Sequence, residues 1–182
     1  LFRNCFLIGK RFRLAHIRFR DNKVIEVATF RRAPTPDELP DDPGDHFHFV
    51  ENVFGSPRQD AFRRDFTINA LFYDIATFSV IDHVGGLEDL QARRLRVIGD
   101  PQTRFREDPV RMLRALELAA RLDFTLDPDL AAGMRCCAPL IAEASPSRLR
   151  DEVTELFRRG VGGKVLLQAR DFGLLPHLLA GY

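Results

Sequence analysis

Three carboxylates occupy positions where they could either support local structure or take part in chemistry. The first, Glu26, stands mid-strand between Ile25 and Val27 in the segment KVIEVATF. A solvent-facing residue of an edge strand is the commoner explanation for such a position. The alternative is a catalytic or metal-binding carboxylate. That role would need acidic partners, because Mg²⁺ binds through several oxygen ligands.

The second carboxylate, Asp65, follows two arginines in RRDFTINAL, residues 63 to 71. As the N-cap of a helix, Asp65 would accept backbone amide hydrogen bonds while the arginines face solvent. Alternatively, a helix N-terminus flanked by Arg63 and Arg64 could hold a phosphate. Both interpretations can hold together.

The third carboxylate, Asp108, opens the segment DPVRMLRALELAARL. Asp108 followed by Pro109 predicts a helix start, with the aspartate as N-cap and the proline at the first helical position. At about 100° per residue, one apolar stripe of this helix faces the core. It consists of Val110, Leu113, Leu116 and Ala120.

Three arginines, Arg111, Arg114 and Arg121, fall together beside that stripe. Asp108 lies three residues before Arg111, so the two side chains can pair around the helix start. A solvated basic face explains most helices of this kind. A fork of arginines and a carboxylate could instead read the donor and acceptor edge of a nucleobase.

Composition limits the possible classes of protein. The 182 residues carry a net charge of +1, so a nucleic-acid site would have to come from local clustering of basic residues. The three cysteines, two of them adjacent, do not suit a disulfide framework and favour a reducing compartment such as the cytoplasm. The sequence shows neither a signal peptide nor an apolar run long enough to span a bilayer.

The order of expected elements predicts an α+β fold with two domains. Strands are expected within residues 5–19, 23–30, 78–82 and 95–98, a hairpin turn at Asp21-Asn22, a polar loop over 33–46, and helices over 58–75, 109–122, 128–137, 147–159 and 162–172. The mixed α/β half gives way to an all-helical half near residue 100. We therefore expect domains over residues 1–100 and 101–182.

Five segments, taken in order, resemble one protein family. They are IEVATFRR, RRDFTINALFYDI, IDHVGGLEDLQARRLRVIGDP, RFREDPVRMLRALELAARLDF and SPSRLRDEVTEL. Together they resemble the class II nucleotidyltransferases, which comprise the bacterial poly(A) polymerases and the CCA-adding tRNA nucleotidyltransferases. The stretch LIGKRFRLAHI resembles a marker of the poly(A) polymerase branch.

The resemblance implies a nucleotidyltransferase head domain followed by a helical neck that binds nucleotide and RNA. It also implies transfer of AMP from ATP to RNA 3′ ends without a template, with two Mg²⁺ ions. A CCA-adding enzyme is the first alternative, and an inactive relative that binds RNA or nucleotide is the second.

The resemblance also assigns individual residues. It places Glu26 near the metal ions, Asp65 in the catalytic set or at the ribose, five residues at the nucleotide and three at RNA. The nucleotide-binding residues are Arg64, Asn69, Asp108, Arg111 and Arg114, and the RNA-binding residues are Lys10, Arg11 and Arg13. Glu117 departs from the family pattern, which often has an arginine there.

Two family motifs, GG-x-x-R-D and an Asp-x-Asp pair on the next strand, precede the matched segments in the family, and the sequence before IEVATFRR contains neither. We expect the chain to begin downstream of both. We also expect this chain by itself to be inactive, because one carboxylate cannot organise two Mg²⁺ ions.

Overall fold

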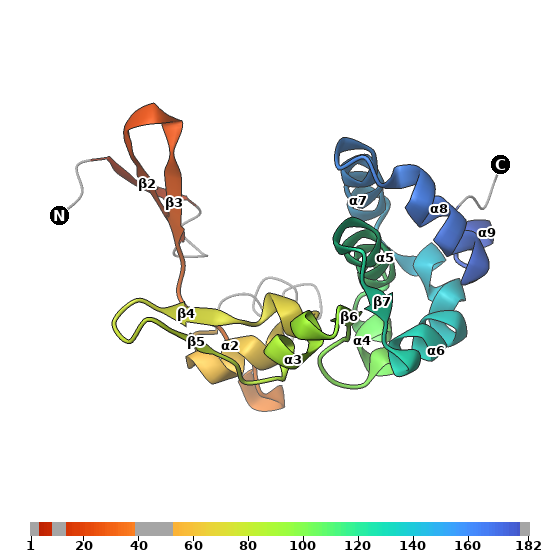
Figure 1. Ribbon diagram of the computed structural model, residues 1–182, viewed down its shortest axis with the longest axis horizontal. Helices are drawn as coiled ribbons and strands as arrows, with labels where there is room; N and C mark the ends of the chain where they lie inside the picture. The colour runs from red at the N-terminus through yellow and green to blue at the C-terminus, as the bar shows by residue number, and fades with distance from the viewer. Residues whose placement is uncertain (1–3, 9–13, 39–52, 179–182) are drawn as a thin grey trace. The chain divides into compact units, whose positions relative to one another are not determined.

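The computed structural model describes residues 4–8, 14–38 and 53–178, and the chain divides into two compact units that meet between Arg63 and Arg64 (Figure 1). Strands dominate the first unit and helices the second, so the predicted α+β class is confirmed. The change to all-helical structure falls inside the second unit, and the domain boundary near residue 100 stays a prediction.

A three-stranded antiparallel sheet forms the first unit's N-terminal part, in the order β1 (Cys5–Ile8), β2 (Leu14–Arg18), β3 (Val24–Val27). The 3-10 turn η1 (Arg20–Asn22) closes the β2–β3 hairpin. Asn22 has a φ of 58°, a left-handed conformation that asparagine tolerates. The predicted hairpin is thus confirmed, although β3 ends at Val27 rather than Phe30.

The remainder of the first unit consists of the 3-10 turn η2 (Pro36–Glu38) and helix α2 (Pro57–Arg63). The buried Asp60 on α2 accepts a hydrogen bond from the backbone N–H of Arg31 at 3.0 Å. This bond fastens the helix to the segment that follows the sheet. The predicted RNA-binding residues Lys10, Arg11 and Arg13 lie outside the described residues.

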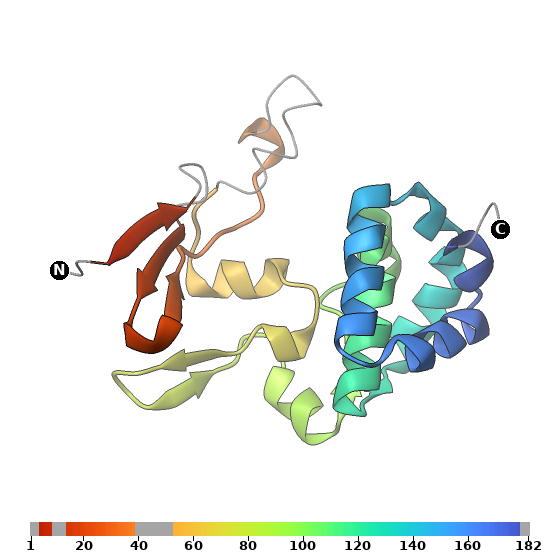
Figure 2. The same ribbon diagram turned by 90° about the horizontal axis from the view of Figure 1, so that it is seen from above.

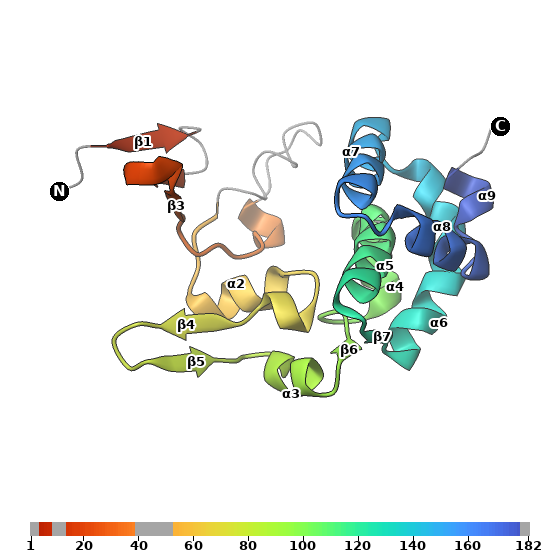
Figure 3. The same ribbon diagram turned by 45° about the horizontal axis from the view of Figure 1, so that its top comes forward.

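The second unit begins with a short hairpin and continues mainly as helices (Figure 3). Its elements are η3 (Thr67–Asn69), β4 (Phe72–Asp74), β5 (Ser79–Ile81), α3 (Gly86–Gln91), β6 (Arg94–Leu95), α4 (Pro101–Glu107), α5 (Val110–Leu122), β7 (Thr125–Leu126), α6 (Pro128–Cys137), η4 (Ala138–Glu143), α7 (Pro146–Arg158), α8 (Gly162–Asp171) and α9 (Leu175–Leu178). The last four long helices predicted from the sequence are confirmed, with ends shifted by at most one residue.

The helix expected over residues 58–75 is wrong beyond Arg63. The chain there pairs with a remote segment instead: Phe66 forms a β-bridge with Val97, and the N–H of Thr67 donates to the carbonyl of Arg96 at 3.0 Å. A bond from the N–H of Ile98 to the carbonyl of Asp65, at 2.9 Å, completes the exchange. These contacts satisfy the backbone without a helix.

Two further expectations were wrong in the second unit. Strand β7 forms after residue 101, where no strand was expected, by pairing in parallel with β6. It is two residues long, too short to show any periodicity. Helix α4 was missed, although Asp100 caps it by accepting the N–H of Thr103 at 2.7 Å and Pro101 follows at the first position.

Helix α5 is the centre of the hydrophobic core. Its predicted stripe is buried, with Leu113 and Leu116 fully inaccessible to solvent. Helices α4, α7 and α8 and the β6–β7 pair all contact it. Close helix approach elsewhere needs a glycine: a Cβ added at Gly133 on α6 would lie 2.7 Å from the Cβ of Pro101 on α4.

A buried carboxylate, Asp89 on α3, connects three segments of the second unit. It accepts hydrogen bonds from Thr67 Oγ1 at 2.7 Å, Arg94 Nε at 2.8 Å and Arg96 Nε at 2.8 Å. Burial alone would raise the pKa of Asp89, but these three hydrogen bonds outweigh it, and the pKa lies below its usual range. Asp89 therefore stays ionised and holds η3 and β6 against α3.

None of the helices within residues 14–38 and 53–178 is long and apolar enough to cross a membrane. Cys5, Cys136 and Cys137 are all free thiols, and Cys137 is buried.

Replacing Asp89 by Asn should lower the free energy of unfolding by about 3 kcal/mol, the lower end of the range for removing one partner of a buried ion pair. The lower end applies because Arg94 and Arg96 keep part of their exposure. Urea unfolding followed by circular dichroism measures this loss.

The matched control is Asp171→Asn, which removes an exposed carboxylate that pairs with Arg170. It should change the free energy of unfolding by less than about 0.5 kcal/mol. Equal unfolding midpoints for the two variants would contradict the assigned role of Asp89.

Candidate functional site

Helix α7 lies alongside α5 (Figure 2), and three carboxylate–arginine contacts join the two segments. We call them the first, second and third cross-helix pairs. They are Asp108–Arg148, Arg114–Glu152 and Glu117–Arg159. Residue numbers rise together along both segments, so the two helices run in the same direction.

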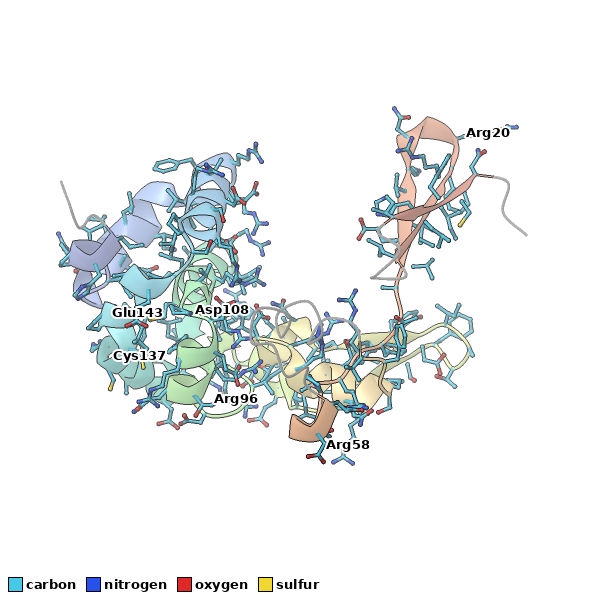
Figure 4. All side chains as sticks on the ribbon, turned by 180° about the vertical axis from the view of Figure 1, so that it is seen from behind. Arg20, Arg58, Arg96, Asp108, Cys137 and Glu143 are labelled. Atoms are coloured by element: carbon cyan, nitrogen blue, oxygen red, sulfur yellow. The ribbon has the colours of Figure 1, made fainter. Side chains whose placement is uncertain are left out.

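The first cross-helix pair is bidentate. Arg148 donates from Nη1 to Asp108 Oδ1 at 2.9 Å and from Nη2 to Oδ2 at 2.7 Å. Asp108, labelled in Figure 4, also accepts the N–H of Val110 at 3.3 Å. Pro109, not Asp108, is the N-cap residue of α5. The predicted pairing with Arg111 is wrong, because Arg148 holds both carboxylate oxygens.

Arg111 is held beside Asp108 by a different acid. Its Nη1 donates to Glu107 Oε2 and to the carbonyl of Arg104, both at 2.8 Å. Arg104 donates to the same Glu107 oxygen at 2.7 Å. Burial, followed by the charge of Arg111, lowers the pKa of Arg104. Arg111 thus keeps a fixed place near Asp108 without contacting its carboxylate.

Asp65, Asn69 and Arg114 come together at the second cross-helix pair. Asp65 Oδ2 accepts from Arg114 Nε at 3.0 Å and Nη2 at 2.6 Å, while Oδ1 accepts from Asn69 Nδ2 at 3.1 Å. Arg114 also reaches Glu152 Oε1 at 3.5 Å. Three residues that the sequence assigned to nucleotide binding or catalysis therefore share one hydrogen-bonded cluster.

The carboxylate of Asp65 is firmly ionised. Burial by itself raises the pKa of Asp65, but the charge of Arg114 and hydrogen bonds from Asn69, Arg114 and the N–H of Phe66 outweigh it and lower the pKa. The predicted N-cap role is wrong, because only the three-residue turn η3 follows Asp65 in this fully described stretch. The expectation of a phosphate site at this helix N-terminus is therefore also wrong.

Arg64 lies next to this cluster. Its Nη1 donates to the carbonyl of Asn69 at 3.1 Å, and its guanidinium lies over the ring of Phe72, 5.4 Å from the centroid. The carbonyl of Arg64 accepts from Arg104 Nη2 at 2.6 Å. The structure thus places Arg64 beside Asn69, and their assignment to the nucleotide stays a prediction.

The third cross-helix pair contains Glu117, whose side chain is only 5% exposed. Its Oε1 lies 2.7 Å from Arg121 Nε and 2.9 Å from Arg159 Nη1. Two arginines therefore neutralise the carboxylate that departs from the family pattern.

A polar cavity of about 380 Å³ lies between α5 and α7. It is lined by Asn69, Val110, Arg114, Glu117, Leu118, Arg121, Arg148, Asp151, Glu152, Glu155 and Arg159. Four arginines and four carboxylates balance in charge, and two apolar side chains complete the lining. Its volume falls within the range of small-molecule sites, and such a lining suits a polar ligand with both donors and acceptors.

Glu26 lies in the first unit, on β3, with its side chain 64% exposed. His16 Nε2 lies 3.0 Å from Glu26 Oε1 but lacks hydrogen-bond geometry. Within the described ranges, no group of three or more His, Cys, Asp or Glu side chains could hold a metal ion. The described residues thus do not complete a two-metal site, and the metal role of Glu26 stays a prediction.

Sequence reasoning missed the contribution of α7, which supplies Arg148, Glu152 and Arg159. The segment RLRDEVTELFRR carried a signal, since Arg148 and Glu152, and likewise Glu155 and Arg159, are four residues apart. Such spacing puts each pair on one helix face. The partners of that face on α5 could not be read from the spacing.

Asp65→Asn should remove a pH-dependent part of the stability. Because the folded-state pKa of Asp65 is lowered, its contribution is present above the ordinary aspartate pKa of about 3.9 and is lost as the pH falls through the folded value. The difference in unfolding free energy between wild type and variant should be largest near neutral pH and shrink below about pH 4. Urea unfolding over this range measures it; a constant difference would contradict the prediction.

Comparison with known proteins places the chain in a family. Residues 1–96 match the family described as "Poly A polymerase head domain", and residues 123–181 match "Probable RNA and SrmB- binding site of polymerase A". Poly(A) polymerase I of Salmonella typhi is 45% identical over 98% of this chain and 39% of its own length. A CCA-adding enzyme of Bacillus pumilus is 36% identical over 87% of this chain and 38% of its own length.

Among solved structures, a tRNA nucleotidyltransferase complexed with a primer tRNA and an incoming ATP analog is similar, with a TM-score of 0.77 and 30% identity. The match covers 96% of this chain and 47% of that protein. The present chain therefore spans less than half of the proteins it matches.

The head-domain match covers 96 of the 182 residues, more than half of the chain. It confirms the resemblance drawn from the five sequence segments and the expected head fold. The chain belongs to the poly(A) polymerase head-domain family of nucleotidyltransferases.

Proposed function

We propose that the protein containing this chain adds AMP from ATP to RNA 3′ ends without a template. The observation that carries this proposal is the cavity between α5 and α7, which is lined by Asn69 and Arg114 of the Asp65 cluster and by Arg148 of the first cross-helix pair. Greater identity to a poly(A) polymerase than to a CCA-adding enzyme supports the branch.

Asp108 and Arg111 would read the nucleobase. A carboxylate accepts from the exocyclic amino group of adenine, and a guanidinium donates to its ring nitrogens. Arg148 grips Asp108 through both oxygens and Glu107 holds Arg111, so neither side chain needs much ordering when a base arrives. Oδ2 of Asp108 can accept a second hydrogen bond beside that from Arg148, which leaves Asp108 able to bind base and Arg148 together.

The neighbouring cluster would bind the sugar and phosphates. Asp65 is ionised and already accepts two hydrogen bonds on each oxygen, so a ribose hydroxyl would replace one of them, and Asn69 can both donate and accept. Arg64 and Arg114 donate hydrogen bonds to Asn69 and Asp65 of this cluster, and their charges suit the triphosphate. We assign all four residues to the nucleotide on this basis.

We also propose that the intact protein uses two Mg²⁺ ions and that Glu26 lies near them. The described residues alone do not provide that site. RNA would reach the head through Lys10, Arg11 and Arg13, and RNA affinity should fall steeply with salt. The free cysteines fit a reducing compartment, and we propose the cytoplasm.

Residues 1–100 would form the C-terminal part of the head domain, and residues 101–182 the helical neck. CCA addition is the second candidate function, favoured by the structural similarity to a tRNA nucleotidyltransferase bound to primer tRNA. A binding protein without catalysis would share the cavity but add no nucleotides.

The function is tested with the full-length protein, a tRNA lacking its 3′ CCA, all four nucleotides and Mg²⁺. A long ladder that requires only ATP is the expected product on a sequencing gel. A sharp stop after three added nucleotides would identify a CCA-adding enzyme instead. No extension at all would favour the binding protein.

Asp108→Ala should lower kcat/KM for ATP by about ten- to a hundredfold, because a base contact of this kind contributes about 1–3 kcal/mol. The loss should appear for ATP and CTP, which both carry an exocyclic amino group, more than for GTP and UTP, which carry a carbonyl at that position, since Asp108 is proposed to accept from the amino group. Steady-state kinetics on an oligo(A) primer measure these values. An equal loss for every nucleotide would show that Asp108 acts on structure and not on the base.

A further inference from the structure

Glu117 is a carboxylate buried in α5, the helix at the centre of the hydrophobic core. Burying an unpaired carboxylate is costly, and the cost is offset only by close cationic partners. Arg121 comes from the next turn of α5, and Arg159 comes from the end of α7, after Arg158. Hydrogen bonding to Glu117 and its charge raise the pKa of Arg159.

The three cross-helix pairs alternate in sign. Along α5 the charges are negative, positive and negative, at Asp108, Arg114 and Glu117, and α7 carries the opposite sign at each contact. Sliding α7 by one contact would bring like charges together, which is unfavourable. The third pair therefore helps to fix the register and spacing of α7 on α5.

Five of the six charged residues in these pairs also bound the cavity on its two sides. Glu117 and Arg114 line it from α5, and Arg148, Glu152 and Arg159 from the α7 segment. The spacing that the third pair sets is thus the width of the cavity. Arg159 also reaches Glu155 Oε2 at 3.5 Å, which orients it further.

We propose that the Glu117–Arg159 pair fixes the width of the cavity and thereby makes the site selective for an adenine over a cytosine base. The inference rests on the proposed function. Glu117 acts through Arg159 and Arg121 and is a positioning residue. A wider cavity lets Arg148, and with it Asp108, shift, and a site that no longer fits a purine closely discriminates less against the smaller pyrimidine.

The test is Arg159→Gln in the full-length protein, with Arg158→Gln as the matched control. Both arginines pair with Glu155, but Arg158 is 72% exposed and Arg159 alone of the two lines the cavity and reaches Glu117. For Arg159→Gln, we expect the KM for ATP to rise about tenfold, kcat to stay within about twofold, and the preference for ATP over CTP to fall about tenfold. Arg158→Gln should match the wild type.

Two further variants separate positioning from folding. Arg159→Lys keeps a positive charge beside Glu117 and should stay within about threefold of wild-type selectivity. Glu117→Gln should reproduce the loss of selectivity seen with Arg159→Gln. A loss of kcat accompanied by a lower melting temperature, at unchanged ATP preference, would overturn the proposal, as would equal behaviour of the Arg158 and Arg159 variants.

The wild-type protein distinguishes a failure of this proposal from a failure of the proposed function. If the wild-type protein adds no AMP, calorimetric dissociation constants for ATP and CTP replace the kinetic ones. Arg159→Gln should then bring the two constants about tenfold closer together than in the wild type. A wild type that binds ATP and CTP equally, or a variant that keeps the wild-type ratio, would overturn the positioning role.

Discussion

Carboxylates withdrawn from water must find cationic partners, and this constraint organises the second unit around α5. Asp65, Asp108 and Glu117 are each largely buried and each paired with an arginine from another segment or another turn. The apolar stripe of α5 would pack against many surfaces of suitable shape. The ion pairs are directional, and they determine which of these surfaces packs against α5.

Arg114 shows how one residue can serve structure and site together. It joins Asp65, which precedes η3, to Glu152 on α7, while its own helix is fixed in the core. Burial by itself lowers the pKa of Arg114, but Asp65 and Glu152 raise it, and the net effect is a raised pKa. Its charge is therefore permanent. A substrate would meet a cluster whose members are already in place, and such preorganisation reduces the entropy lost on binding.

The position of Glu117 illustrates how a carboxylate can lie next to a polar cavity without leaving an unpaired negative charge there. An acid next to a site for a polyanion would repel it if left exposed. Here the acid is buried under two arginines, which remain partly exposed and line the same cavity. The cavity then presents guanidinium groups although the helix itself carries a carboxylate.

Structural features that depend on residues three or four positions apart could be predicted from the sequence alone. The helices over 110–122 and 128–137 followed from apolar spacing and from Asp and Pro at their starts, because helix formation and capping are local. The family followed from motifs in register along the chain. Two features depend on long-range packing and could not be predicted from local sequence. They are the strand-like path of residues 65–67, which pair with residues 96–98, and the partner of Asp108. Asp108 pairs with Arg148, 40 residues away, and not with Arg111 three residues on, because packing of α7 brings a fork-shaped guanidinium to both carboxylate oxygens.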